Sequence, residues 1–405
     1  MHILIVTQYF WPESFVVNGL VSDLKIRGHD VEVLTGLPNY PSGVIYNGYS
    51  LFKGPWTEVY GGATVHRVFL FPRGVGFLRL AINYFSFVIG GSLRALFLKN
   101  KYDIILCFAL SPITSCLPAI LLRCLRKIPL VVWVQDLWPE SISAVGAVKS
   151  EKVINLTGKL VRFIYQRCDV ILTQSQAFRN SVLKWGGTEN KIHYIPNWAE
   201  PFVENEIIPE WVEQLPKGFK IGFAGNIGKA QDMATLIETA ELLRQYADIK
   251  WIIVGDGSEK AWLDSEIKKR KLEDIIFTVG KKPYNEMLPF FSTCDTLYVS
   301  LTDEFIFSLT IPSKIQAYMS AAKPIVASLN GEGARILAEA EAGLSASSES
   351  PTELSKVILQ LKEMSEPQRR QLGLNGLKYF KENFEKSRIV SQIEEILNKT
   401  LREKN

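Results

Sequence analysis

KIGFAGNIGK, residues 220–229, joins an apolar, β-rich run to a turn with two glycines, and residues 233–245 then follow with helical spacing. The same order returns at once, because the apolar run 251–254 leads into the glycine turn GDGS at residues 255–258. Strands that alternate with helices at this spacing are typical of parallel βαβ units. The second half of the chain is therefore predicted to be a Rossmann-like domain, with further strands at residues 276–279, 296–301 and 325–328.

The first half of the chain shows the same alternation. A helix is predicted over residues 19–27, with Gly28 at its carboxyl end. We therefore expect an α/β fold of two Rossmann-like, doubly wound domains that face a cleft, with ligands at the carboxyl ends of the strands. The predicted strands are residues 3–7, 31–35, 64–69, 104–108, 130–134 and 170–173. The expected divisions are a first domain at 1–200, a linker at 201–218, a second domain at 219–386 and a helix at 387–405 that crosses back to the first domain.

The composition is that of an ordinary globular protein of 405 residues, with 47% hydrophobic and 22% charged residues. The five cysteines form no CxxC pair and the four histidines have no metal-ligand spacing, so we expect a reducing, cytoplasmic compartment and no metal site. Residues 1–200 hold 20 Lys and Arg against 12 Asp and Glu, a formal charge of +8, whereas the remainder holds 26 against 30. A basic half can indicate nucleic acid or an anionic membrane surface, and charge alone does not choose between them.

Three turns of the second half could hold a diphosphate. Residues 225–229 and 255–258 let backbone amides approach an anion, and residues 310–314 (TIPSK) place a hydroxyl and an ammonium beside the free amides of a helix start. An ordinary βα turn is the alternative for each of them. The first half has no GxGxxG after its first strand and the chain has no Asp-x-Asp, so we expect neither a nicotinamide cofactor nor a metal–diphosphate complex.

Residues 69–101 are the candidate membrane-binding segment. The run is rich in aromatic residues, but Arg79, Asn83 and Arg94 interrupt it, so we expect it not to span a bilayer. A helix of this composition with basic flanks can lie in the membrane interface. A buried helix in the outer layer of the sheet is the alternative. The start of the chain is not expected to be a signal peptide, because its apolar run stops at Gln8.

Seven motifs in order resemble glycosyltransferase family 4, a retaining family with the GT-B fold. They are TQYFWPE (7–13), RGHDVEVLTG (27–36), QDLWPES (135–141), IPNW (195–198), FAGNIG (223–228), VGDG (254–257) and IPSK (311–314). The resemblance is nearest to bacterial L-fucosamine (N-acetyl-L-fucosamine) transferases of O-antigen and capsule assembly. It implies a UDP-sugar donor, a lipid-linked saccharide acceptor, a place on the cytoplasmic face of the membrane, no cofactor and no nucleic acid.

The turns and the resemblance together give the candidate site residues. Catalytic roles fall on Asp136, Lys229 and Lys314, and acceptor binding falls on Glu13, Asn18, Gln135 and Glu140. Donor binding falls on Gly225, Asn226, Gly228, Gly255, Asp256, Gly257, Ser258, Lys281, Asp303, Glu304, Ser313 and Ile315. For Asp136 the alternative is a carboxylate that caps a helix or closes a turn, and for Glu13 it is a solvated loop carboxylate.

Several positions depart from the family pattern. The phosphate-binding Arg and Lys of the first donor loop fall on Asn226 and Gln231, and the two glutamates of the E-x7-E element fall on Leu309 and Ala317. We expect Lys229 and Lys314 to supply the missing cations. Asp303 or Glu304 is expected to replace the missing carboxylate. An epimerase of similar two-domain shape and a non-enzymatic saccharide or lipid binding module are the alternative functions; the epimerase is disfavoured because no suitable set of His and carboxylates is present.

Overall fold

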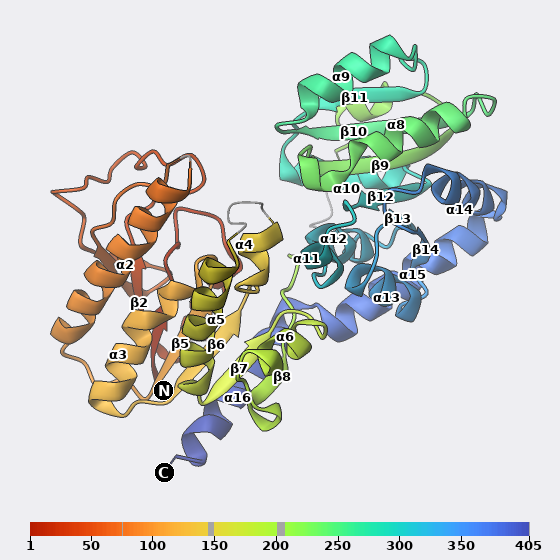
Figure 1. Ribbon diagram of the computed structural model, residues 1–405. Helices are drawn as coiled ribbons and strands as arrows, with labels where there is room; N and C mark the ends of the chain where they lie inside the picture. Colours follow the sequence, from red (N-terminus) through yellow and green to blue (C-terminus); the bar gives the residue numbers. More distant parts are fainter. Residues whose placement is uncertain (75, 145–149, 201–206, 405) are drawn as a thin grey trace. The chain divides into compact units, whose positions relative to one another are not determined.

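The computed structural model describes residues 1–74, 76–144, 150–200 and 207–404. It contains two compact units, residues 1–197 with 389–405 (unit 1) and residues 198–388 (unit 2). In each unit, helices cover a sheet of mainly parallel strands (Figure 1). The predicted α/β architecture of two doubly wound sheets is confirmed.

Unit 1 has an eight-stranded sheet in the order β3-β4-β2-β1-β5-β6-β7-β8. All neighbours are parallel except β3 and β4. Its strands are β1 His2–Val6, β2 Asp30–Gly36, β3 Thr57–Tyr60, β4 Ala63–Val68, β5 Ile104–Ala109, β6 Leu130–Val134, β7 Val170–Thr173 and β8 Ile192–Tyr194. Its helices are α1 Val16–Ile26, α2 Phe77–Phe97, η1 Ile113–Cys116, α3 Leu117–Arg126, α4 Glu140–Ala144, α5 Glu151–Gln166, α6 Phe178–Lys184, η2 Glu189–Lys191 and α16 Lys386–Arg402, which joins this unit from Ile389 on.

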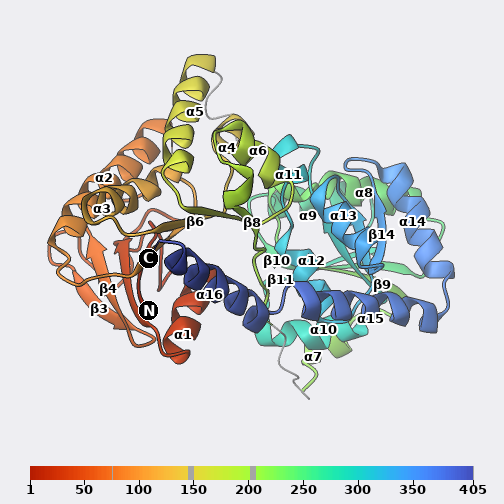
Figure 2. The ribbon, with the colours of Figure 1, turned by 90° about the horizontal axis from the view of Figure 1, so that it is seen from below.

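Burial on both faces explains the apolar runs that predict the central strands. All residues of β5 and β6 are buried, as parallel strands covered on both sides require. Helices α1 and α16 lie on one side of the sheet, and α2, α3 and α5 lie on the other (Figure 2). Arg27 and His29, at the end of α1, both contact Glu394 of α16, at 2.9 and 2.8 Å.

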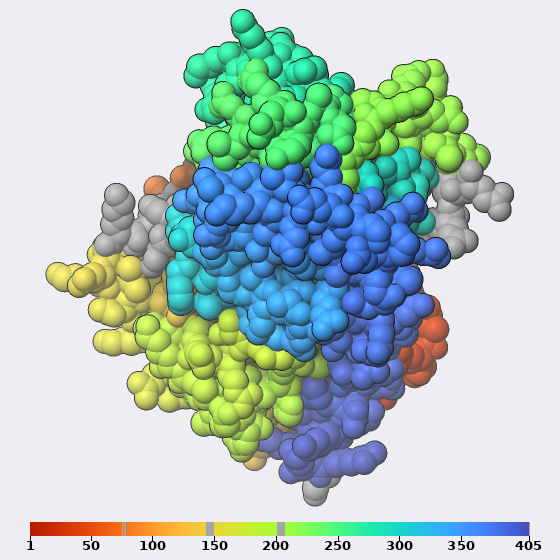
Figure 3. All heavy atoms as spheres, turned by 90° about the vertical axis from the view of Figure 1, so that its right-hand side faces the viewer, coloured from red at the N-terminus to blue at the C-terminus, as the bar shows by residue number. Residues whose placement is uncertain are grey.

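Unit 2 has a six-stranded, fully parallel sheet in the order β11-β10-β9-β12-β13-β14. Its strands are β9 Phe219–Asn226, β10 Ile249–Asp256, β11 Ile276–Gly280, β12 Thr296–Ser300, β13 Ile325–Ser328 and β14 Gly343–Ala346. Its helices are α7 Glu210–Glu213, η3 Lys229–Gln231, α8 Met233–Leu242, α9 Lys260–Lys269, η4 Tyr284–Glu286, α10 Met287–Thr293, α11 Phe305–Ser308, α12 Ser313–Ser320, α13 Glu332–Glu339, α14 Pro351–Glu363 and α15 Glu366–Asn383. Helix α8 packs against α14, and α12 packs against α15. The blue helices α14 and α15 form a broad part of the surface of unit 2 in Figure 3.

The strands that the sequence does not predict are short. Strand β3 pairs antiparallel at the sheet edge and alternates in exposure, β8 has three residues, and β14 is only partly buried. The segment expected as a linker, 201–218, contains helix α7, whose Trp211 donates to Glu286 of the same unit at 2.7 Å. Residues 201–206 of that expected linker lie outside the described residues.

Candidate functional site

The carboxyl edge of the sheet in unit 2 carries most of the predicted donor residues. The sheet reverses its winding between β9 and β12, because β9 continues to β10 on one side and β12 to β13 on the other. Ligands of open α/β sheets bind beside such a switch point. The last residues of β9 and β10, the residues that follow β9, β10, β11 and β12, and the start of α12 lie at this edge. They include Gly225, Asn226, Gly228, Gly255, Asp256, Gly257, Ser258, Lys281, Asp303, Glu304 and Ser313.

The glycines of the first two turns pack against each other. Gly225 and Gly255 are paired in register, and a Cβ on Gly255 would lie 1.9 Å from the Gly225 carbonyl oxygen. A Cβ on Gly257 would lie 2.4 Å from the carbonyl oxygen of Ile227. The close approach of two loops therefore accounts for Gly255 and Gly257 without any ligand. The Asp256 carboxylate accepts from the amide of Gly257 at 2.8 Å, which closes that turn locally.

Lys314 is the cation at the centre of this edge. Its ammonium donates to Gln231, lies 4.9 Å from the ring centroid of Phe223, and packs where a Cβ on Gly225 would stand. Burial lowers the pKa of Lys314 from 10.5 to about 8, and no carboxylate among the described residues lies within ion-pair distance of it. A half-buried ammonium without a negative partner is suited to bind an anion.

Free amides lie beside this ammonium at the start of α12. Pro312 precedes the helix, and the amides of Ser313 and Lys314 donate to no acceptor in the described part of the chain. Ile315 is not placed to bind a donor as predicted. Its side chain is fully buried, and its amide donates to the Pro312 carbonyl at 2.9 Å. It contributes no polar group to the edge.

The turn at residues 225–229 is not followed directly by a long helix. Lys229 begins the three-residue η3, and α8 begins only after Asp232. The Asp232 carboxylate accepts from the Thr235 amide at 3.3 Å, so the chain itself caps α8. The start of α8 therefore offers no free helix terminus to an anion at Gly228. Lys229 remains as an exposed cation at this edge, and Lys281 is exposed after β11.

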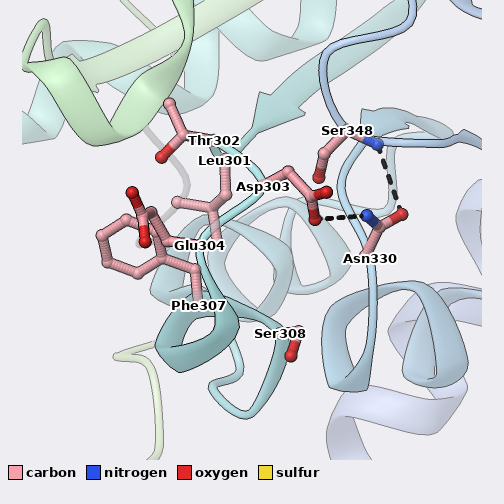
Figure 4. Close-up of a pocket in the computed structure, with 8 residues that line it drawn as sticks. All are labelled: Leu301, Thr302, Asp303, Glu304, Phe307, Ser308, Asn330 and Ser348. Carbon is pink, nitrogen blue, oxygen red and sulfur yellow. Dashed lines mark hydrogen bonds between the residues drawn. The ribbon is translucent and has the colours of Figure 1, made fainter. Parts of the chain in front are cut away.

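A small polar pocket lies beyond β12. Asp303 points to Asn330 and accepts from its amide at 2.8 Å, whereas Glu304 is turned away beside Phe307 (Figure 4). The side-chain carbonyl of Asn330 accepts from the backbone amide of Ser348 at 3.3 Å. The hollow between these side chains has no room for even a water molecule, whereas pockets that bind small ligands measure roughly 300–1,000 Å³. Its polar groups can therefore contact only the edge of a ligand, such as the hydroxyl groups of a sugar that lies over them.

In unit 1, Gln135 and Asp136 follow β6 at the carboxyl edge of the sheet. Asp136 accepts from the Ser111 amide at 3.0 Å, and burial raises the pKa of its carboxyl group. Gln135 is buried; its carbonyl accepts from the Asn197 amide at 2.8 Å, and its own Nε2 has no partner. One carboxylate with a raised pKa beside an unpaired amide is suited to contact hydroxyl groups. The bond to Ser111 also fits the alternative of a turn carboxylate.

Glu13 is a clamp between two loops. It is buried, and its carboxylate accepts from the amides of Phe10, Asn39 and Tyr40 at 3.0, 2.7 and 2.7 Å. Burial raises the pKa of Glu13 to about 7, against the lowering effect of these three donors. It is therefore neither a solvated loop carboxylate nor open to an acceptor. The nearby Asn18 donates to the Glu13 carbonyl at 2.7 Å, and its Oδ1 is buried without a partner.

Glu140 begins α4 and is held by α6. One oxygen accepts from the Ser181 hydroxyl at 2.7 Å and from the Trp185 indole at 3.0 Å, and the other is buried without a partner. These bonds fix α4 against α6. Only the second oxygen remains for a ligand.

Two family models match the chain in succession. The Glycosyl transferase 4-like domain matches residues 14–198, and Glycosyl transferases group 1 matches residues 207–379. The crystal structure of Anabaena Alr3699/HepE in complex with UDP and glucose is similar at a TM-score of 0.69 and 18% identity, over 98% of this chain and 100% of that chain. The chain therefore has the GT-B fold and carries two glycosyltransferase domains in succession.

Two relatives match part of the chain. WbjE of Pseudomonas aeruginosa, named as a glycosyltransferase, is 28% identical over 58% of this chain and 60% of its own length. WcaI of Escherichia coli, named as a colanic acid biosynthesis glycosyl transferase, is 28% identical over 64% of this chain and 65% of its own. The chain thus spans slightly less than two thirds of the length of these relatives.

Arg73 is a residue of unit 1 that the sequence does not single out. Its guanidinium donates to the Tyr9 hydroxyl at 3.2 Å and lies 5.3 Å from the ring centroid of Tyr40. Its backbone amide donates to the side chain of Asn39 at 2.7 Å, which fixes the loop. No carboxylate forms an ion pair with it among the residues that the structure describes. The sequence feature that could have pointed to Arg73 is its place as a single arginine in the loop before α2.

Helix α2 exposes a continuous apolar stripe, the α2 stripe, made of Leu78, Ile82, Phe85, Ile89, Leu93 and Leu96, which are between 43% and 71% exposed. The opposite face carries the buried Asn83 and Phe87 and packs against α3, β2 and β4. Residues Leu78–Phe97 are long and apolar enough to cross a membrane by length and composition, with a mean hydropathy of 1.4. Because one face packs on the sheet and the other is exposed, α2 fits an interfacial helix better than a spanning one. In the described ranges, no group of three or more His, Cys, Asp or Glu is arranged to hold a metal ion.

Proposed function

We propose that the protein is a glycosyltransferase that moves N-acetyl-L-fucosamine, or a related N-acetylated sugar, from a UDP-sugar to a lipid-linked saccharide in surface polysaccharide biosynthesis, with retention and without a metal. The observation that carries the proposal is the half-buried ammonium of Lys314, which has no carboxylate partner and lies beside the free amides of α12 at the switch point. The name of WcaI and the UDP in the HepE structure support the class of pathway and of donor.

Sugar transfer requires positive charge near the bond between the sugar and the diphosphate, where negative charge develops. Cleavage passes through an oxocarbenium-like state while negative charge grows on the leaving diphosphate. Lys314 and the amides of Ser313 and Lys314 would stabilise that charge, and the exposed Lys229 would add a second cation. The pocket of Asp303 and Asn330 would hold a sugar edge through hydroxyl groups. In unit 1, Asp136 would receive the acceptor hydroxyl.

Transfer of sugar with release of UDP tests this proposal. A panel of UDP-sugars is incubated with the protein and a membrane lipid extract, and UDP is measured together with the lipid product. We expect one donor to give lipid-dependent UDP release and a product with the anomeric configuration of the donor. Lys314→Ala should lose this activity while remaining folded. An epimerised donor would support the epimerase, and no turnover of any donor would support a binding module.

We also propose that the protein is peripheral on the cytoplasmic face of the membrane. The α2 stripe and the formal charge of +8 in residues 1–200 support this, because an apolar stripe and basic charge together favour anionic bilayers. The double variant Phe85→Ser, Ile89→Ser should sediment less with anionic vesicles than the wild type. Leu374→Ser, at an apolar residue of α15 that is 43% exposed, is the matched control and should bind as the wild type does. Equal sedimentation with neutral and anionic vesicles at low salt would reject the electrostatic part.

A further inference from the structure

The guanidinium of Arg73 carries a charge that no ion pair in the described part of the chain compensates. It donates to the Tyr9 hydroxyl at 3.2 Å and lies 5.3 Å from the centre of the Tyr40 ring, and both of these groups are neutral. Arginine is half-buried here, whereas charged groups at such depth are normally paired with an opposite charge. An uncompensated guanidinium is therefore suited to a negative ligand.

The surroundings of Arg73 are rigid and polar. Tyr9 follows β1, Tyr40 follows β2, and Tyr84 lies on α2, so three elements meet at this guanidinium. The Glu13 carboxylate binds the amide of Tyr40 and thereby holds the loop whose ring lies against Arg73. A binding group that is fixed in advance loses little entropy when its ligand arrives.

The position is next to the carboxylate expected to receive the acceptor. In the sheet order of unit 1, the winding reverses between β1 and β5, and Tyr9 and Ser111 follow these two strands. Tyr84 packs edge-on against Trp138, which donates to the Ser111 hydroxyl at 3.1 Å, and the Ser111 amide donates to Asp136 at 3.0 Å. Burial raises the pKa of the Tyr84 phenol, which therefore stays protonated and can donate a hydrogen bond. The buried Tyr9 hydroxyl already donates to Asn83 at 3.4 Å and accepts from Arg73, so it positions the guanidinium.

We propose that Arg73, held by Tyr9 and assisted by the hydroxyl of Tyr84, binds the phosphate of the lipid diphosphate that carries the acceptor saccharide. The guanidinium offers a planar fork to phosphate oxygens, which is the geometry that arginine uses for this group. This inference rests on the proposed lipid-linked acceptor. The α2 helix joins the two parts of such a ligand, because Tyr84 faces the phosphate site while its neighbour Phe85 belongs to the exposed α2 stripe.

Farnesyl diphosphate is the probe, titrated below its micellar range by calorimetry with saturating UDP present, so that the cations of unit 2 are occupied. The variant is Arg73→Gln, and Arg79→Gln, at an exposed arginine of α2, is the matched control. We expect Arg73→Gln to weaken binding by about tenfold or more, as the loss of one charge-assisted contact predicts, and Arg79→Gln to change it less than about threefold. Arg73→Lys should be intermediate, and inorganic pyrophosphate should show the same dependence on Arg73 at lower affinity.

Farnesol, which lacks the diphosphate, separates a phosphate site from a purely apolar one. It should bind the wild type and Arg73→Gln equally. Three results would each overturn the proposal. They are equal affinity of the wild type and Arg73→Gln for farnesyl diphosphate, no binding of farnesyl diphosphate to the wild type, and a loss of farnesol binding in Arg73→Gln as large as its loss of farnesyl diphosphate binding. If Arg73→Gln does not fold, Arg73→Lys takes its place. An Arg73→Lys protein that binds farnesyl diphosphate and pyrophosphate more weakly than the wild type, but farnesol equally well, supports the proposal, and one with wild-type affinity for both diphosphates overturns it. The UDP-release screen is independent: its failure with every donor would reject the proposed function and leave Arg73-dependent diphosphate binding in place.

Discussion

Lys314 is expected to lose its charge near pH 8, within the range of an ordinary binding assay. Burial lowers the pKa of its ammonium from 10.5 to about 8, and no described carboxylate offsets this effect. UDP is fully ionised above about pH 7, because the second ionisation of a phosphate lies near 6. A fall in affinity for UDP above that pH that is absent from Lys314→Arg therefore reports the lysine.

The size of the effect follows from the fraction of charged lysine. With a pKa of about 8, about nine in ten of the ammonium groups are protonated at pH 7 and about one in eleven at pH 9. The dissociation constant for UDP should therefore rise about tenfold between these pH values. Lys314→Arg stays charged and should give a flat profile. Lys314→Met should bind UDP about 10- to 100-fold more weakly at pH 7 and also give a flat profile.

The free energy of unfolding should rise with pH, whereas the affinity for UDP should fall. The folded pKa of Lys314 lies below the unfolded one, so its charging costs folding free energy in full below pH 8, and this cost disappears as the pH rises through 10.5. The difference between 10.5 and 8 sets an upper limit of about 3 kcal/mol. Lys314→Met removes this cost and also loses the hydrogen bond to Gln231, so we expect a gain of about 1–2 kcal/mol at pH 7 and none at pH 11.

Calorimetric titration with UDP at pH 7, 8 and 9 measures the dissociation constant, and urea denaturation measures the free energy of unfolding. Lys229→Ala, at an exposed lysine, should weaken binding at every pH and keep the pH dependence of the wild type. Turnover of Lys314→Met should fall by about 100-fold, as for one preorganised charge stabiliser, and affinity for the UDP-sugar should fall less than affinity for UDP. A flat profile in the wild type, or a folded Lys314→Met protein with normal UDP binding, would refute the reasoning.

Three further expectations concern the metal, the glycine turns and the loop clamp. Transfer should persist in excess chelator, because lysines and amides hold the diphosphate, and activity that only magnesium or manganese restores would contradict this. Gly255→Ala should lower the free energy of unfolding by about 2 kcal/mol or more in urea and weaken UDP binding, whereas Gly280→Ala, whose Cβ meets nothing within 4 Å, should cost only about 1 kcal/mol. Glu13→Ala should destabilise unit 1 by about 3 kcal/mol or more because three buried amides lose their acceptor, and a stable Glu13→Ala protein with lost transfer would instead make Glu13 a ligand of the acceptor.

The fold could be predicted where a strand is buried on both faces. Such strands are continuous apolar runs, so β6 and β7 were predicted with their exact limits, Leu130–Val134 and Val170–Thr173. Strands β3 and β14 could not be predicted, because an edge strand buries little and its residues need not be apolar. Helix α8 ends at Leu242, three residues before the predicted limit, since helical spacing does not mark the turn that follows.

The sequence predicts which turns meet at the site, but it does not predict which of the cations there lack a negative partner. Strand–turn–helix patterns place residues at the carboxyl edge of a sheet whatever their roles, which is why most of the donor residues meet there. Whether a cation is compensated depends on neighbours from distant parts of the chain. Lys314 lies beside Gln231 and Phe223, and Arg73 lies among three phenols, and neither arrangement has a signature at short range in the sequence. An unpaired charge that the fold holds at a switch point costs stability, and a protein keeps such a group where a ligand supplies the opposite charge. The two units each hold one such cation, which suits the proposed transfer, whose donor and acceptor are both phosphate esters.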